Sequence, residues 1–300
     1  MIGISAQYGL NTCLRLKKFF LKNASEKYVC GRSLFSSNQS LLSSEDLLKN
    51  HNICNERSNP VFKRILLKLS GEALAGTRGI GIDSNVLSYA ASEIAKAKSL
   101  GVEIAIMVGG GNFFRGASAL GIPNFDRAQA DGVGMLATCM NAMIVQSAIQ
   151  SIGVESVSLS AIAFSHQLME PYSRTAAQAH LAAGRVVVLG GGTGMPFCTT
   201  DTAAAQRAAE IHADVILKAT KVDGIYSRDP LKLKHGEVAE RYDKLSYNEV
   251  VEKGLGVMDA TAMILCREQK IPLMVFNVMQ PGAIMKAAMG DATIGTLVTF

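Results

Sequence analysis

From residue 61 onward the chain repeats one pattern: a strand-sized run of apolar residues, a turn rich in glycine, and a longer segment with helical apolar spacing. The apolar runs are continuous, which is typical of parallel strands buried on both faces by the helices between them. The expected strands span residues 64–69, 102–108, 185–189, 214–218, 272–276 and 295–300. The expected helices span residues 84–99, 131–151, 202–213, 247–253 and 261–269. The sequence therefore predicts an α/β protein, a three-layer α/β/α sandwich with a mainly parallel central sheet.

The first sixty residues do not follow this pattern. Residues 1–44 contain six basic residues, one acidic residue and eight serines, and residues 14–22 form a short basic amphipathic segment. This composition is typical of an organellar transit peptide. We expect a transit peptide in residues 1–44, a polar linker in residues 45–60 and one folded domain in residues 61–300. The pattern favours the mitochondrial matrix over the plastid stroma, and a basic tail kept by a cytoplasmic protein is the alternative.

Composition narrows the class of protein. Hydrophobic residues make up 48% of the chain and charged residues 18%, which is enough apolar material for a core and excludes global disorder. The net charge is +5, but the first 59 residues hold eight basic and four acidic residues, so the rest carries about +1 and no large basic patch is expected. No apolar run approaches the roughly 20 residues of a spanning helix. We therefore expect neither a membrane nor a nucleic acid as partner.

The six cysteines show no metal-ligand spacing, and no metal-ligating residues are predicted.

Glycine-rich turns follow three of the apolar runs. They lie at residues 70–71, 109–111 and 190–194. Ligands of such sheets bind at the carboxyl ends of the strands, and glycine there lets backbone N–H groups approach an anion closely. Three such turns in one chain predict a ligand rich in phosphate.

Several phosphate-binding motifs are absent. The chain has no Gly-Lys dipeptide, so a P-loop is excluded. The dinucleotide fingerprint fails because Phe114 stands where its third glycine belongs, and the protein-kinase motifs are missing. The remaining interpretation is a phosphate-handling enzyme on another scaffold.

A family resemblance rests on long motifs in a fixed order. They are KRILLKLSGEAL at residues 63–74, GGGNFFRG at 109–116, TGMPFCTTD at 193–201 and LKATKVDG at 217–224. Shorter matches lie at residues 134–141, 257–259 and 272–277. The chain resembles the bacterial-type uridylate (UMP) kinases of the amino acid kinase family over residues 61–300, and the basic leader suggests an organelle-targeted eukaryotic version.

The resemblance implies transfer of the γ-phosphoryl group of ATP to UMP, with Mg²⁺ as cofactor and a homo-oligomer, usually a hexamer. The residues that it implies in catalysis are Lys68, Asp201, Lys218 and Arg115. Those implied in binding ATP are Lys68, Leu69, Ser70, Gly71, Gly111, Arg115, Thr220, Tyr226 and Asp229. Those implied in binding UMP are Gly110, Asp131, Thr193, Gly194, Met195, Pro196, Phe197, Cys198, Thr199 and Thr200.

Some of these residues also carry a signal of their own, beside a structural alternative. Lys68 interrupts an apolar run, and a buried lysine normally needs an anionic partner; the alternative is a surface lysine at a strand end. Asp201 precedes an alanine-rich helix, where an N-cap role is the alternative. The alternative for Arg115 is a salt bridge within its loop. Asp131 suits ribose hydroxyls, and a helix N-terminal acid is its alternative.

Two departures from the family pattern and two other functions stay open. Residues 173–177 lack the Arg-rich run that relatives often carry. Met195 and Cys198 stand where the family loop commonly carries Asn and an aromatic residue, which puts nucleobase contact in doubt. A carboxylate kinase of the same family, of the acetylglutamate or aspartate type, is the first alternative, although Asp131 opposes a carboxylate substrate. The second alternative is a non-catalytic regulatory or RNA-binding derivative.

Overall fold

The computed structural model of the protein describes residues 60–116, 124–228 and 238–300. These residues belong to one unit, Ser58–Phe300. The predicted transit peptide, nearly all of the predicted linker and Asp229 lie outside the described residues.

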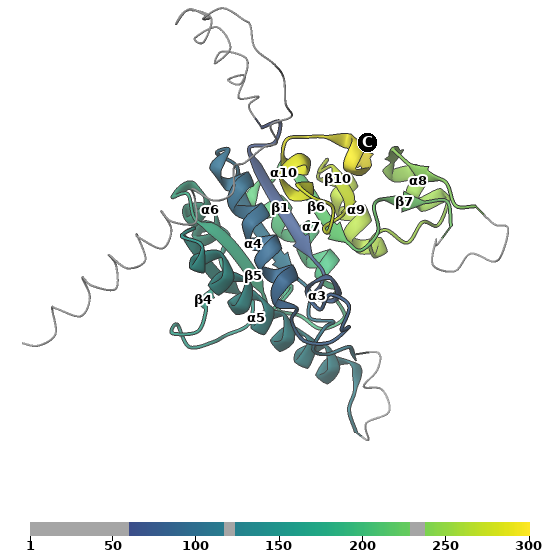
Figure 1. Cartoon of the computed structure of the whole chain (residues 1–300). Helices are drawn as coiled ribbons and strands as arrows, with labels where there is room; N and C mark the ends of the chain where they lie inside the picture. The colour runs from purple at the N-terminus through teal and green to yellow at the C-terminus, as the bar shows by residue number, and fades with distance from the viewer. Residues whose placement is uncertain (1–59, 117–123, 229–237) are drawn as a thin grey trace, which may run out of the picture. The chain divides into compact units, whose positions relative to one another are not determined.

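A nine-stranded sheet forms the middle of the described unit, with the order β4-β3-β5-β2-β1-β6-β10-β11-β9 (Figure 1). Every pairing in it is parallel except the one between β10 and β11. The strands are β1 (Arg64–Leu69), β2 (Glu103–Val108), β3 (Ser156–Ser160), β4 (Glu170–Pro171), β5 (Val186–Gly190), β6 (Val215–Thr220), β9 (Lys244–Ser246), β10 (Leu273–Asn277) and β11 (Gly295–Thr299). Two short strands, β7 (Ile225–Tyr226) and β8 (Arg241–Tyr242), form a separate antiparallel pair.

Helices cover both faces of the sheet. One core cluster joins it to α4 (Ser84–Ser99), α5 (Arg127–Ser151) and α10 (Ala283–Ala288). A second cluster joins the other face to α6 (Arg174–Ala182), α7 (Thr200–Ile211), α8 (Tyr247–Glu252) and α9 (Ala260–Glu268). The short α3 (Gly71–Leu74) follows β1, and a 3-10 turn, η4 (Ala292–Ile294), precedes β11. The predicted three-layer α/β/α sandwich with a mainly parallel sheet is confirmed.

Some elements begin at other residues than predicted, or were not predicted at all. The helix at 84–99 has its predicted ends. Helix α5 begins at Arg127 rather than at residue 131, because the Asp126 side chain and Gln129 form a capping box there. Strand β3 was not predicted because its sequence alternates Ser with apolar residues, yet all five residues are buried. Helices α6 and α10, with nine and six residues, were also not predicted.

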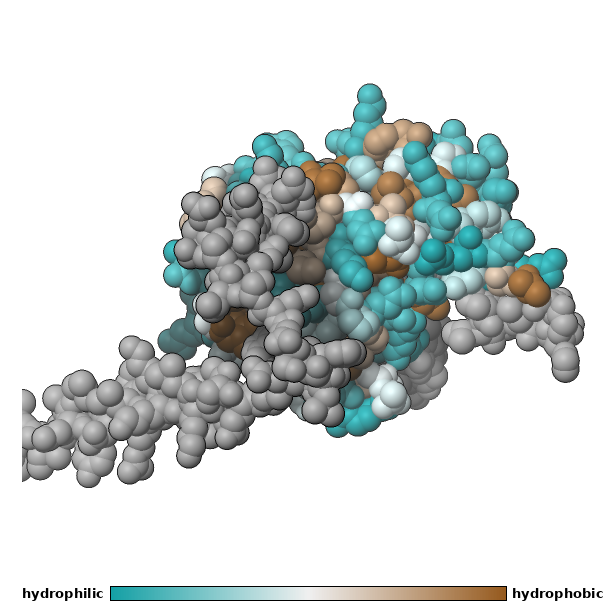
Figure 2. Space-filling view, turned by 45° about the horizontal axis from the view of Figure 1, so that its top comes forward, coloured by the Kyte–Doolittle hydropathy of each residue, from teal (hydrophilic) through white to brown (hydrophobic). Residues whose placement is uncertain are grey.

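Helix α5 is long and apolar enough to cross a membrane by length and composition alone, contrary to the expectation that no such segment exists. In the structure it packs on β3 and β5, with Ala142, Val145 and Ile149 fully or almost fully buried. Hydrophobic residues form small separate groups on the face shown in Figure 2, where most of the described surface is hydrophilic. The core of the domain thus accounts for part of the apolar character of α5, since 39% of its most apolar stretch is buried.

Candidate active site

The order of the strands places one crevice at the centre of the sheet. Strands β2 to β5 lie on one side of β1, whereas β6, β10 and β11 lie on the other. Strands that follow β1 in the sequence are thus added first on one side of it and then, from β6, on the other. The boundary between β1 and β6 is a topological switch point, and α/β sheets bind ligands at the carboxyl ends of the strands at such a point.

Two lysines lie side by side at this crevice. Lys68 of β1 and Lys218 of β6 are register partners on neighbouring strands, so their side chains leave the same face of the sheet. Their neighbours Leu66 and Ile216 pack in the cluster that contains α7. Because Lys68 is only 6% exposed, the interpretation of a surface lysine is wrong.

Asp201 lies between these two ammonium groups. Its Oδ1 is 2.5 Å from Lys68 Nζ, and its Oδ2 is 2.6 Å from Lys218 Nζ. Asp201 is in the first turn of α7, the crossover helix between β5 and β6, and Thr199 is the N-cap that accepts the Asp201 N–H at 3.0 Å. The alternative role of Asp201 as N-cap is therefore wrong, and its carboxylate is available to the lysines. We call Lys68, Asp201 and Lys218 the charged triad.

The charged triad has one more positive than negative group in a buried place. Burial by itself raises the pKa of Asp201, but Lys68 and Lys218 outweigh burial and hold that pKa below its ordinary value. Burial lowers the pKa of Lys218, and Lys68 lowers it further, while Asp201 and Asp259 oppose the change. An added anion would relieve this excess of positive charge.

Two glycine turns pack tightly beside the charged triad. A Cβ on Gly71 would overlap Asn112 Oδ1, and it would lie 2.8 Å from Gly111 N. Ser70 Oγ accepts the Ala73 N–H at 3.0 Å and so starts α3. The turn after β1 and the turn after β2 can therefore approach each other only because glycine is present.

A buried pair of amides holds the second glycine turn, and this pair was not predicted. Asn112 and Asn141 exchange two hydrogen bonds of 3.1 and 2.7 Å, and Asn141 Nδ2 also donates to the Gly109 carbonyl at 2.6 Å. Both side chains are buried. A buried Asn in helix α5 and another after β2 could be paired only through the tertiary structure.

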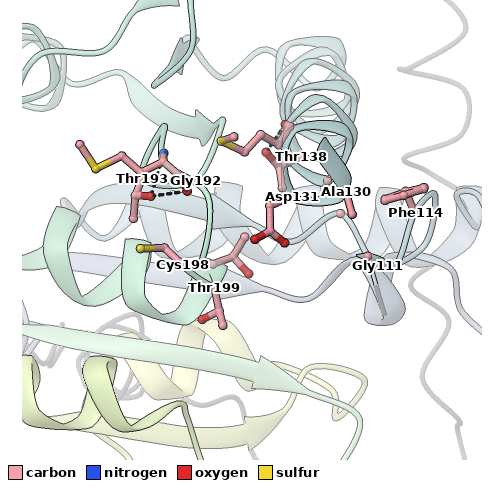
Figure 3. Close-up of a pocket in the computed structure, with 15 residues that line it drawn as sticks. Gly111, Phe114, Ala130, Asp131, Thr138, Gly192, Thr193, Cys198 and Thr199 are labelled. Atoms are coloured by element: carbon pink, nitrogen blue, oxygen red, sulfur yellow. Dashed lines mark hydrogen bonds between the residues drawn. The ribbon is translucent and has the colours of Figure 1, made fainter. Parts of the chain in front are cut away.

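A cleft between α5 and the loop before α7 brings together most of the residues predicted to bind UMP; we call it the α5 cleft. Its lining includes Gly110, Asp131, Thr193, Met195, Cys198, Thr199 and Thr200, together with Gly111. In Figure 3 the Asp131 carboxylate points from α5 toward the loop side that carries Cys198 and Thr199. Gly194, Pro196 and Phe197, also predicted, are not among its lining residues.

Asp131 connects the two sides of the α5 cleft. It accepts the Phe197 N–H at 2.8 Å and pairs with Arg127 at 2.9 Å. Because α5 begins at Arg127, Asp131 lies in the second turn, and the interpretation as a helix N-terminal acid is wrong. Phe197 has φ +65°, a left-handed conformation that this hydrogen bond helps to hold.

A second cleft, of about 650 Å³, lies beyond Lys218, and we call it the β7 cleft. Lys218, Thr220 and Tyr226 line it, together with Val257. Thr220 and Tyr226 are among the residues predicted to bind ATP, and Asp229, also predicted, lies outside the described residues. Its volume is in the usual range for a small-molecule site, about 300–1,000 Å³.

The remaining predicted residues lie near the triad or at the edge of the α5 cleft. Leu69 and Ser70 follow Lys68 directly, at the end of β1. Arg115 forms a salt bridge with Glu72, and both side chains are about half exposed. The loop salt bridge considered for Arg115 is thus present, and its role toward ATP stays a prediction.

Comparison with known proteins gives consistent relatives. The model of the amino acid kinase family matches residues 63–277. A uridylate kinase of Ectopseudomonas mendocina is 48% identical over 239 residues, which are 80% of this chain and 94% of that protein.

Solved structures give the same result. The UMP kinase of Bacillus anthracis superposes with a TM-score of 0.74 at 40% identity, over 79% of this chain and 96% of that one. The UMP kinase of Ureaplasma parvum gives a TM-score of 0.73 at 34% identity, over 79% and 99% of the two chains.

Proposed function

The chain belongs to the amino acid kinase family, and we propose that it transfers the γ-phosphoryl group of ATP to UMP, giving UDP and ADP. The charged triad carries this proposal. Lys218 lines the β7 cleft, whereas Thr199 and Thr200, which precede Asp201, line the α5 cleft. The triad therefore stands between two clefts, where a phosphoryl group passes from a donor in one to an acceptor in the other.

The reaction needs positioning and charge neutralisation more than covalent chemistry. The attacking atom is a phosphate oxygen of UMP, which is anionic at neutral pH, so no side chain has to remove a proton. Lys68 and Lys218 supply positive charge to the phosphoryl group in transit. Asp201 keeps the two ammonium groups together, which like-charge repulsion would otherwise separate.

The predicted Mg²⁺ fits this site as an ion bound to ATP. The described residues contain no cluster of three or more His, Cys, Asp or Glu side chains that could hold a metal. Mg²⁺ is commonly held by one or two carboxylates and substrate phosphates. Asp201 is the carboxylate of the triad, and it would help to hold the ion, which supplies further charge neutralisation when bound.

UMP recognition is assigned to the α5 cleft. We propose that Asp131 accepts hydrogen bonds from ribose hydroxyls, and Gly110 and Gly111 line the same cleft. Met195 and Cys198 line the cleft without the amide and aromatic ring common in relatives. We therefore propose that nucleobase contact depends on the backbone of residues 193–200 more than on these two side chains.

An acceptor assay tests the proposed function. The purified chain is given MgATP and, separately, UMP, CMP, acetylglutamate or aspartate, and ADP release is coupled to NADH oxidation. We expect turnover with UMP and none with the two carboxylates. Phosphorylation of an amino acid alone would favour the carboxylate kinase, and turnover equal to that of Lys68→Ala would favour a non-catalytic protein.

We also propose assembly into a homo-oligomer. Leu136 and Met140, four residues apart on α5, are each 48% exposed, and apolar side chains on one helix face suit a contact with a second copy. Light scattering coupled to size-exclusion chromatography measures the mass. A monomer at micromolar concentration would contradict the proposal.

Residues 1–44 are proposed to direct the chain to an organelle, with the mitochondrial matrix favoured over the plastid stroma. The proposal rests on their basic, serine-rich and acid-poor composition. Mass spectrometry of the N-terminus of the protein from its native cells tests it. An N-terminus at Met1 or residue 2 would favour the cytoplasmic alternative.

A further inference from the structure

The connection between α8 and α9 lines the β7 cleft and contacts the first turn of α7, beside the α5 cleft. Its Val257 lines the β7 cleft, and the Val257 carbonyl accepts a hydrogen bond from Lys218 Nζ at 2.5 Å. Two residues later, Asp259 precedes α9 and accepts the Ala262 N–H at 3.0 Å as the N-cap of that helix. One short segment thus touches a member of the charged triad and begins a helix of the same layer.

The Asp259 carboxylate makes contacts beyond those of a cap. It accepts hydrogen bonds from Thr202 Oγ1, at 2.9 and 3.0 Å to its two oxygens, and from Thr199 Oγ1. Thr199 is the N-cap of α7 and lines the α5 cleft, and Thr202 lies in the first turn of α7. Asp201 lies between them in the sequence. A single carboxylate therefore fixes the helical turn that carries Asp201.

On the basis of the function proposed above, we infer that Asp259 is a positioning residue for phosphoryl transfer, because it joins the N-terminus of α9 to that of α7. Asp259 lines neither cleft, so it acts through the groups that it holds. With both threonines fixed, Asp201 stays between Lys68 and Lys218, and Thr199 stays in the α5 cleft.

The test variant is Asp259→Ser. Serine is a good N-cap and keeps the hydrogen bond at α9, but it has no carboxylate to reach the two threonines. We expect kcat with UMP to fall by about 10- to 100-fold, the loss typical of displaced catalytic groups. The thermal midpoint should change no more than in Asp291→Ser, a matched control in which the same exchange is made at the cap of η4.

A second variant separates positioning from folding. Thr202→Val removes the hydrogen bonds from Thr202 Oγ1 to the Asp259 carboxylate at nearly constant volume. We expect its effect on kcat to be less than additive with that of Asp259→Ser, as for groups that act together.

The outcomes are distinct. Wild-type kcat and KM in Asp259→Ser, a loss of activity matched by unfolding, or full additivity with Thr202→Val would overturn the positioning role while leaving the UMP kinase function in place. A wild-type enzyme without turnover on UMP would overturn both. A lowered kcat, non-additivity with Thr202→Val and an intact fold would support the inference.

Discussion

At the level of single residues, one carboxylate accounts for two buried lysines. Lys68 and Lys218 are adjacent on neighbouring strands, where like charges repel. Asp201 gives one oxygen to each, at 2.5 and 2.6 Å. The three side chains leave a net positive charge, which suits an incoming phosphate. Removal of one lysine leaves an ion pair, whereas removal of Asp201 leaves two like charges, so the two kinds of substitution should affect stability differently.

Replacement of Lys68 by alanine should damage catalysis and spare the fold. Lys218 still pairs with Asp201 in this variant, and the repulsion between the two lysines is gone. We expect kcat to fall by about 100- to 1,000-fold, the usual cost of losing one preorganised charge-stabilising donor. Steady-state kinetics and a thermal melt measure the two quantities, with Lys98→Ala on α4 as the control. A melt that collapses in Lys68→Ala would assign the lysine a structural role.

Activity and stability should change in opposite directions at alkaline pH. The pKa of Lys218 lies below its ordinary 10.5, mainly because the side chain is buried. Between the lowered pKa and 10.5 the unfolded chain keeps a proton that the folded chain has released, so the contribution of this group to the free energy of unfolding rises with pH. Over the same window kcat falls, because the ammonium charge is lost.

Comparison with the Lys218→Met variant isolates the contribution of the Lys218 ammonium group to stability and to kcat. Urea unfolding and kcat are measured from neutral pH to about pH 10.5, the ordinary lysine range. The wild-type minus variant difference in unfolding free energy should rise with pH. A flat difference, or a wild-type kcat that stays constant over the window, would show that Lys218 does not titrate as described.

At the level of elements, the α5 cleft depends on how closely the glycine turn after β2 approaches α5. A Cβ on Gly110 would lie 2.9 Å from both Ala137 Cβ and Gly134 O. The turn can contact the helix only without a side chain there. Asn141 of α5 holds the same turn through the Gly109 carbonyl.

Gly110→Ala should therefore separate the turn from α5. We expect a loss of about 1–3 kcal/mol in the free energy of unfolding, typical of overpacking, and a raised KM for UMP. Gly132→Ala is the control, since no atom lies within 4 Å of its added Cβ. As a helix-interior change it should stabilise by about 0.5–1 kcal/mol. Equal effects of the two substitutions on KM would contradict the role given to the close approach.

At the level of the whole molecule, the central strand of the sheet is also the first one. β1 begins at Arg64, and the backbone N–H groups of Lys63 and Arg64 donate to Asp214 Oδ2 at 2.7 and 2.8 Å. Among the described residues, both core clusters and the charged triad lie after position 60. A chain that begins at Pro60 should keep the kcat and thermal midpoint of the full chain.

The control for this truncation is a chain that begins at Lys68. It lacks Ile65, Leu66 and Leu67, which are fully buried in the centre of the sheet, and we expect it not to fold. Circular dichroism and the coupled assay on both chains decide the matter. Loss of activity in the longer one would assign a catalytic or folding role to the first 59 residues.

The sequence by itself was sufficient for features that depend on neighbouring residues. Continuous apolar runs such as residues 64–69 and 102–108 identified the buried parallel strands. Helical apolar spacing predicted residues 84–99 with the ends that the structure shows, where Asp83 is the N-cap. Glycine turns at the strand ends predicted a phosphate ligand. The motif at residues 193–201 marked a loop of which most residues line the α5 cleft.

Only the tertiary structure decided which distant groups meet. The sheet order brings Lys68 and Lys218, 150 positions apart, into register, and the crossover α7 places Asp201 between them. The Asn112–Asn141 pair and the contact of Asp259 with α7 left no local trace, because a polar side chain in a sequence does not state its partner. Periodicity records whether a residue is buried, whereas charge pairing depends on strand order, and strand order is set by how the whole core packs.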